Sequence, residues 1–172
     1  MCSNNLKLPI RAAPYRHQRE AAAFALDKLV NSGGAALLME MGTGKTLTTI
    51  AIVGHLWLSG HIRRLLVVAP LSILGVWEDE FRKFADYDYS LAVLEGTGAR
   101  KADTIRHMTG AALQVLVVNY ESAWRLEKEL AAWRPDGIVC DEGHKIKTHN
   151  IAASKALHRL GARVPYRLLL TG

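Results

Sequence analysis

Residues 39–46, Met-Glu-Met-Gly-Thr-Gly-Lys-Thr, have the composition and spacing of a phosphate-binding loop. They follow the apolar run 35–38 and open the amphipathic run 47–58, so a strand, a glycine-rich turn and a helix are expected in that order. Backbone N–H groups of such a turn, together with the helix N-terminus, favour a polyphosphate. Lys45 would reach the β- and γ-phosphates, and the Thr46 hydroxyl would ligate Mg²⁺. The residues predicted to bind the nucleoside triphosphate are Met41, Gly42, Thr43, Gly44, Lys45 and Thr46.

A second chemical group, Asp141-Glu142-Gly143-His144, follows the apolar run 137–140. A carboxylate at the tip of a buried strand suits the Mg²⁺ of a bound nucleotide. We therefore expect Asp141 to hold the metal, directly or through water, and Glu142 to polarise the attacking water. His144 could couple the nucleotide site to neighbouring elements. Alone, an acidic pair after a strand is a common strand-to-loop transition, but downstream of a phosphate loop it is the expected second half of an ATPase site.

The elements that must position these groups alternate between strands and helices. Strand runs such as Leu-Leu-Val-Val-Ala are apolar throughout, as expected when both faces of a sheet are covered. The pattern predicts a three-layer α/β/α domain around a mainly parallel sheet, with ligands at the carboxyl ends of the strands. Strands are predicted at 35–39, 65–69, 91–94, 115–119, 137–141 and 167–170, and helices at 16–30, 45–59, 72–84, 99–108, 121–133 and 151–160.

Composition indicates an ordinary globular chain of 172 residues, with 49% hydrophobic and 22% charged residues. The two cysteines lie far apart, which favours a reduced, intracellular protein. The N-terminus lacks the apolar core of a secretory signal, and the apolar stretch 65–77 is too short to span a bilayer. We expect a cytoplasmic protein of bacterial or phage origin, or a nuclear one if the host is eukaryotic. The net charge of +6 fits a nucleic-acid partner, although charge alone is weak support.

The loop and the acidic group resemble two helicase motifs. The general phosphate-loop pattern has glycine five positions before Gly44, where this chain has Met39; helicase-type ATPases relax that position. The loop is similar to motif I of superfamily 2 helicases, and Asp141-Glu142-Gly143-His144 to their DEAH-type motif II. Residues 65–84, 115–122 and 141–150 resemble the corresponding segments of Swi/Snf-type DNA-dependent ATPases, and residues 167–172 resemble the opening of motif III. The chain thus resembles the N-terminal RecA-like lobe of these enzymes over nearly its whole length.

This resemblance implies ATP, Mg²⁺ and DNA as ligands, and by analogy with the family the DNA is duplex. It implies that Gln18 reads the adenine edge, although a solvated glutamine at a helix start is the alternative. It also implies that residues 70–72 and 119–121, at the ends of two strands, grip one nucleic-acid strand. Alternatively, Ser72 and Glu121 only cap the helices they open. Lys145 and Lys147 are either phosphate contacts or a solvated pair.

The expected organisation is a leader at residues 1–14 and a helicase ATP-binding lobe at 15–172 that ends inside motif III. In the family a second RecA-like lobe supplies arginines, and such arginines contribute roughly 10³–10⁵ in rate at related sites. We therefore expect the chain alone to bind Mg·ATP and to hydrolyse it very slowly. Two other functions stay open: a stand-alone P-loop kinase or ATPase, and a non-catalytic nucleotide- or DNA-binding regulatory module. Met39 opposes the first alternative, and the intact Lys45, Asp141 and Glu142 oppose the second.

Overall fold

Within the part of the chain that the structure describes, a six-stranded sheet forms the centre. The computed structural model describes residues 6–143 and 151–172. The strands are β1 (Gly34–Leu38), β2 (Arg64–Ala69), β3 (Tyr89–Val93), β4 (Leu113–Asn119), β5 (Gly137–Cys140) and β6 (Tyr166–Thr171). Their order across the sheet is β1-β6-β5-β2-β4-β3, and every neighbouring pair is parallel. All six carboxyl ends therefore meet along one edge, as the prediction of a mainly parallel sheet requires.

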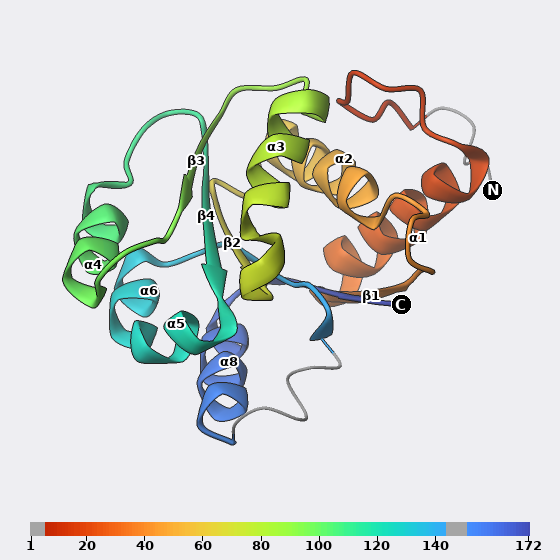
Figure 1. Cartoon of the computed structure of the whole chain (residues 1–172). Helices are drawn as coiled ribbons and strands as arrows, with labels where there is room; N and C mark the ends of the chain where they lie inside the picture. The colour runs from red at the N-terminus through yellow and green to blue at the C-terminus, as the bar shows by residue number, and fades with distance from the viewer. Residues whose placement is uncertain (1–5, 144–150) are drawn as a thin grey trace.

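Helices cover both faces of this sheet (Figure 1). They are α1 (Arg16–Ser32), α2 (Lys45–Leu58), the 3₁₀ turn η2 (Leu71–Ile73), α3 (Leu74–Phe84), α4 (Gly98–His107), α5 (Tyr120–Arg125), α6 (Glu127–Trp133) and α8 (Ile151–Arg163). Helices α1, α2 and α3 pack into one hydrophobic cluster, and α4, α5, α6 and α8 into the other. The predicted three-layer α/β/α architecture is confirmed.

Strand β2 illustrates why the central strands are apolar throughout. Leu65 and Val67 point into the cluster beneath α1–α3, whereas Leu66 and Val68 point into the cluster beneath α4–α8. All four are buried, because successive side chains of a strand alternate between two covered faces.

Most element boundaries lie within one to three residues of the predicted ones, and two helices differ from the prediction in kind. The predicted helix 72–84 begins as the turn η2, and its α-helical part starts at Leu74. The predicted helix 121–133 is divided at Leu126, where φ is −103° and ψ is 20°, into α5 and α6. The apolar spacing of α1 predicts one buried face made of Ala22, Leu26, Leu29 and Val30; the first three are buried, but Val30 is 51% exposed.

Part of the segment that precedes α1 is packed on the body of the protein. Ile10 bridges to Ala85, just after α3, and is itself buried. The Arg11 N–H donates to the Phe84 carbonyl (2.9 Å), and the Pro9 carbonyl accepts from the Asp86 N–H (3.1 Å). Among the described residues, no helix has both the length and the apolar character needed to cross a membrane.

Candidate nucleotide-binding site

The predicted phosphate loop links β1 to α2, so it lies at the carboxyl edge of the sheet. Gly42 and Gly44 both have positive φ angles, 82° and 86°, which glycine adopts without a steric penalty. The Thr43 hydroxyl donates to the Glu40 carbonyl at 2.7 Å and closes the turn. Helix α2 begins at Lys45 and runs for 14 residues. Its first N–H groups therefore face the space beyond the loop, where a helix N-terminus attracts negative charge.

Gln18 lies against this loop and is only 6% exposed, so the alternative of a solvated glutamine is wrong. Its Oε1 accepts from the Tyr15 N–H (2.9 Å), and its Nε2 donates to the Thr43 carbonyl (3.0 Å). A Cβ added at Gly44 would collide with Gln18 Nε2. His17 Nε2 also lies 3.1 Å from the Thr43 carbonyl oxygen. The start of α1 and the phosphate loop therefore form one unit.

Lys45 joins the loop to the acidic group. Its Nζ donates to the Met39 carbonyl (3.0 Å) and lies 4.0 Å from Glu142 Oε1. Both side chains are largely buried, with 12% and 21% of their area exposed. Lys45 opens α2, after the loop that follows β1, and Glu142 follows β5; in the sheet β6 lies between these two strands. Two groups that are about 100 positions apart in the sequence thus meet at one point.

Asp141 lies directly after β5 and is 5% exposed. Burial raises the pKa of its carboxyl above the ordinary value, while hydrogen bonds from Trp77 and the Glu142 N–H, and the charge of Lys45, act in the opposite direction. Oδ1 accepts from the Glu142 N–H (2.9 Å) and Oδ2 from the Trp77 indole (3.1 Å). Glu142 itself has a positive φ of 53°. A non-glycine residue in that region costs free energy, and such strain is common at functional sites.

Two residues at this site were missed by sequence reasoning. The helical spacing of Leu74, Trp77 and Phe81 predicts only a core position for Trp77, and it carries no signal for the hydrogen bond from Trp77 to Asp141. Tyr120 was predicted in a nucleic-acid loop, and its hydroxyl donates to the Asp141 carbonyl. Burial raises the pKa of the Tyr120 phenol well above its ordinary value, so the hydroxyl stays protonated and remains a donor.

The donors at this edge fit a Mg²⁺ that is shared with a nucleotide. Each carboxylate oxygen of Asp141 accepts one hydrogen bond from the protein and so keeps a further lone pair. Because burial disfavours the charge of this carboxylate, a nearby divalent cation would stabilise it. Within residues 6–143 and 151–172, the structure has no group of three or more His, Cys, Asp or Glu side chains that could hold a metal ion. A Mg²⁺ held by one hydroxyl, one carboxylate and phosphates needs no such group.

The two predicted nucleic-acid loops lie at the same edge of the sheet. Residues 70–72 follow β2 and include most of the turn η2, in which Leu71 is 72% exposed. Asn119 ends β4, and its side chain accepts from the Ser122 N–H (2.7 Å), so Asn119 caps α5. The alternative that Glu121 caps this helix is wrong, because the structure assigns the cap to Asn119. His144, Lys145 and Lys147 lie outside the described residues.

A cavity of about 540 Å³ lies elsewhere, on the α8 side of β1 and β6. Its lining includes Ile138, Cys140 and Leu157, and it contains none of the predicted nucleotide-site residues. Burial raises the pKa of the Cys140 thiol to about 12, so this thiol remains protonated near neutral pH. The candidate nucleotide site therefore lies at the carboxyl edge of the sheet, outside this cavity.

The fold and the two motifs together define a P-loop domain of the RecA-like kind, with an Asp-Glu pair beside its phosphate loop. The profile of the SNF2-related domain family matches residues 17–172. The chain therefore belongs to the SNF2-related domain family.

Solved structures agree with this family. The chain superimposes with a TM-score of 0.81 on the "Sulfolobus solfataricus SWI2/SNF2 ATPase core in complex with dsDNA", with 28% identity over 97% of this chain and 34% of that one. A second match is the "Sulfolobus solfataricus SWI2/SNF2 ATPase core domain", with a TM-score of 0.77 and 26% identity; the match covers 100% of this chain and 34% of that one.

The curated relatives that this chain matches are much longer than the chain. It is 31% identical to "Probable ATP-dependent DNA helicase CHR23" of Arabidopsis thaliana over 91% of this chain and 15% of that protein. It is 33% identical to "DNA repair and recombination protein RAD54-like" of Drosophila erecta over 91% of this chain and 21% of that protein. The chain spans about a fifth or less of these relatives. Because they come from a plant and an insect, they give no support to the predicted bacterial or phage origin.

Proposed function

We propose that this chain is the Mg·ATP-binding lobe of a DNA-dependent motor. The observation that carries the proposal is the 4.0 Å approach of Lys45 Nζ to Glu142 Oε1, which joins the phosphate loop to the acidic pair. Lys45 binds the β- and γ-phosphates by exchanging its present carbonyl partner for phosphate oxygens. Thr46 and Asp141 hold Mg²⁺, which neutralises phosphate charge when bound. Glu142 orients and polarises the water that attacks the γ-phosphate.

Gln18 selects adenine in this proposal. Its amide oxygen and nitrogen each have one protein partner and retain one further lone pair and one further N–H. That pair matches the donor and acceptor on the N6 and N7 edge of adenine. The hydrogen bond from Gln18 to the Thr43 carbonyl connects base recognition to the phosphate loop.

Duplex DNA is the proposed second ligand. The relatives named above include a DNA helicase, a DNA repair protein and an ATPase core solved with double-stranded DNA. The exposed turn η2 and the Asn119-capped start of α5 offer N–H groups and hydroxyls at one edge of the sheet, which are the groups that position a DNA backbone. In the complete protein, a second lobe that closes over the nucleotide would turn hydrolysis into movement along DNA.

Two substitutions test the assigned roles in the 172-residue chain. Lys45→Ala should abolish binding of a fluorescent ATP analogue in Mg²⁺, because the phosphate charge loses its cation. Glu142→Gln should leave binding intact, because Glu142 acts on water and not on the nucleotide. Circular dichroism provides the folding control for both variants. Equal loss of binding in the two variants would contradict the roles assigned to Lys45 and Glu142.

A further inference from the structure

Trp77 reaches from the hydrophobic core into the nucleotide site. It is 1% exposed and contacts Phe81 within α3, with the two ring centroids 6.4 Å apart. A buried indole N–H requires an acceptor, because it cannot bond to water. Here the acceptor is Oδ2 of Asp141, at 3.1 Å. The hydrogen bond fixes the direction of one carboxylate oxygen, a constraint that apolar packing alone would not impose.

Asp141 is held by groups from three neighbouring segments. Its N–H donates to the Val68 carbonyl of β2 (2.8 Å), and its carbonyl accepts from the Tyr120 hydroxyl. Trp77 belongs to the helix that follows β2 and η2, whereas Tyr120 is the first residue of α5, directly after β4. Both loops that we propose as DNA contacts therefore continue, within a few residues, into a side chain that bonds to Asp141.

We propose that Trp77 and Tyr120 are positioning residues that transmit contacts at the loops after β2 and β4 to Asp141. This inference rests on the proposed function, since it requires Asp141 to hold Mg²⁺. A DNA strand that orders η2 and the start of α5 would restrict the Trp77 indole and the Tyr120 hydroxyl. The Asp141 carboxylate would then be held in the orientation that Mg²⁺ requires. DNA and Mg·ATP would consequently strengthen each other's binding by a reciprocal factor.

Trp77→Phe tests the hydrogen bond while it preserves most of the ring. The quantity to measure is the Mg²⁺ concentration that gives half-maximal binding of a fluorescent ATP analogue to the 172-residue chain. The change should raise this concentration roughly 10–100-fold, the usual effect of removing a partner that orients a metal ligand. A role confined to the core would lower thermal stability without changing the Mg²⁺ dependence.

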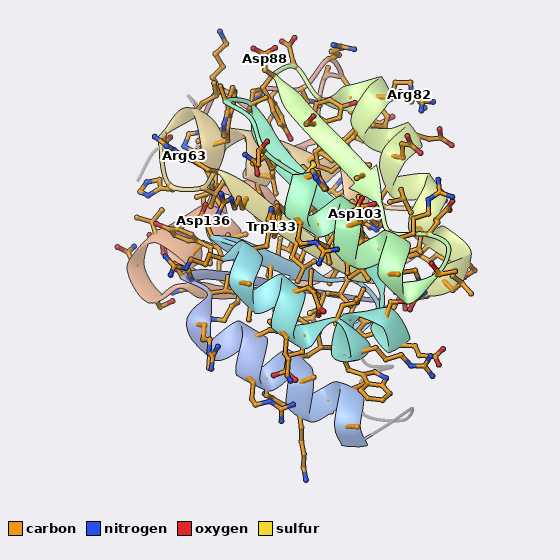
Figure 2. The ribbon with its side chains drawn as sticks, turned by 90° about the vertical axis from the view of Figure 1, so that its left-hand side faces the viewer. Arg63, Arg82, Asp88, Asp103, Trp133 and Asp136 are labelled. Carbon is orange, nitrogen blue, oxygen red and sulfur yellow. The ribbon has the colours of Figure 1, made fainter. Side chains whose placement is uncertain are left out.

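Trp133→Phe is the matched control. Trp133 is also buried, at 6% exposed, and its indole donates to the Met108 carbonyl (3.3 Å). The Trp133 backbone carbonyl accepts a hydrogen bond from the Arg64 side chain, and the nearby Asp136 carboxylate accepts hydrogen bonds from the Arg63 and Arg64 N–H groups. Trp133 therefore lies near the amino ends of β2 and β5 (Figure 2). This variant should keep the wild-type Mg²⁺ dependence, because the Asp141 contacts stay intact.

Tyr120→Phe keeps the inference testable if Trp77→Phe does not fold. It removes only the hydroxyl that bonds to the Asp141 carbonyl, and it should raise the required Mg²⁺ concentration several-fold. Adding duplex DNA should lower that concentration for the wild-type chain and less so for either variant. An unaltered Mg²⁺ dependence in the folded variants, or a wild-type Mg²⁺ dependence that bound DNA does not change, would overturn the inference alone. A wild-type chain that fails to bind nucleotide in Mg²⁺ would overturn the proposed function as well.

Discussion

Gly44 shows at the scale of one residue how the site depends on backbone conformation. Its φ of 86° is strained for other residues, and the Gln18 amide occupies the space that a side chain would need. Gln18 is itself fixed by hydrogen bonds to the Tyr15 N–H and the Thr43 carbonyl. The glycine therefore serves both the turn and the close approach of α1 to the phosphate loop.

Gly44→Ala should destabilise the chain more than Gly42→Ala. Both positions have positive φ, so each substitution costs about 1–2 kcal/mol of backbone strain. At Gly42, an added Cβ meets none of the atoms of the described residues within 4 Å beyond its chain neighbours. At Gly44, the new methyl group must displace Gln18 and break a hydrogen bond, which adds about 1 kcal/mol. Urea unfolding of both variants measures the difference in stability, and equal midpoints would contradict the predicted role of the contact between Gly44 and Gln18.

At the scale of elements, helix α2 approaches its neighbours closely at Gly54. A Cβ at this position would overlap the ring of Tyr87 and the ring of Pro9. The Tyr87 hydroxyl donates to the Ile50 carbonyl of α2 at 2.9 Å, so the tyrosine ring cannot move without losing that bond. The segment between α3 and β3 thereby fixes the position of the helix that begins at the phosphate loop.

Gly54→Ala should consequently destabilise the protein by about 1–3 kcal/mol, the usual cost of overpacking a core. Gly75→Ala is its counterpart on α3, where a Cβ would meet no described atom within 4 Å and φ is not positive. The second change should stabilise the protein by up to about 1 kcal/mol, because alanine is the better helix former. Thermal unfolding of the two variants measures both signs. A stabilising Gly54→Ala would show that Tyr87 does not hold α2.

An ion pair joins α6 to α8, and we expect its contribution to stability to depend on pH. Arg159 donates two hydrogen bonds to Glu127, each 2.6 Å long, and these bonds lower the pKa of the Glu127 carboxyl. A lowered pKa in the folded state contributes stability that is present above the unfolded pKa of about 4.3 and is lost as pH falls through the folded value. Because Arg159 is 56% exposed and Glu127 is 26% exposed, solvent screens the pair and its contribution is small.

Glu127→Gln should therefore lower the midpoint of thermal unfolding slightly at pH 7, and this difference should vanish in strong acid. Glu78→Gln is the control, since Glu78 pairs with Arg82 within one helix and not between two. A Glu127→Gln penalty that stays constant from pH 7 to acid would contradict the ion-pair explanation.

The element types could be predicted because their sequence periods are strong, but some details could not. Apolar runs identified all six strands, and the phosphate loop followed from its glycines. The break at Leu126 lies between good helix formers, Arg125 and Glu127, so residue type gives no signal for it. The strand order and the Trp77–Asp141 hydrogen bond depend on how distant segments pack, which local periodicity does not encode.

At the scale of the whole molecule, the parallel sheet brings separate motifs to one edge. The phosphate loop follows β1, and the acidic pair follows β5. The two proposed DNA loops follow β2 and β4, and the carboxyl ends of all four strands lie on that edge. This convergence could be predicted for Lys45, Thr46 and Asp141 once a parallel sheet was expected. The close contact between Lys45 and Glu142 could not be predicted, because it depends on the strand order of the sheet, in which β6 lies between β1 and β5.

Turnover by the chain alone should be very slow, with or without duplex DNA. The arginines that stabilise the transferring phosphate in related sites contribute roughly 10³–10⁵ in rate, and the family places them on a second lobe. A phosphate-release assay with wild-type protein and Glu142→Gln as the blank measures this rate. Robust DNA-stimulated hydrolysis that the Glu142→Gln change abolishes would contradict the proposal that a second lobe is required.

Calorimetric titration of ATP into the wild-type 172-residue chain, with Mg²⁺ and then with EDTA, tests the central claim most directly. We predict one ATP bound per chain in Mg²⁺, weaker binding in EDTA, and no binding by Lys45→Ala under either condition. Asp141→Asn should bind ATP in a manner that no longer responds to Mg²⁺, because the metal loses its carboxylate. The absence of binding heat from wild-type protein in Mg²⁺, or identical titrations for wild type and Lys45→Ala, would contradict the account.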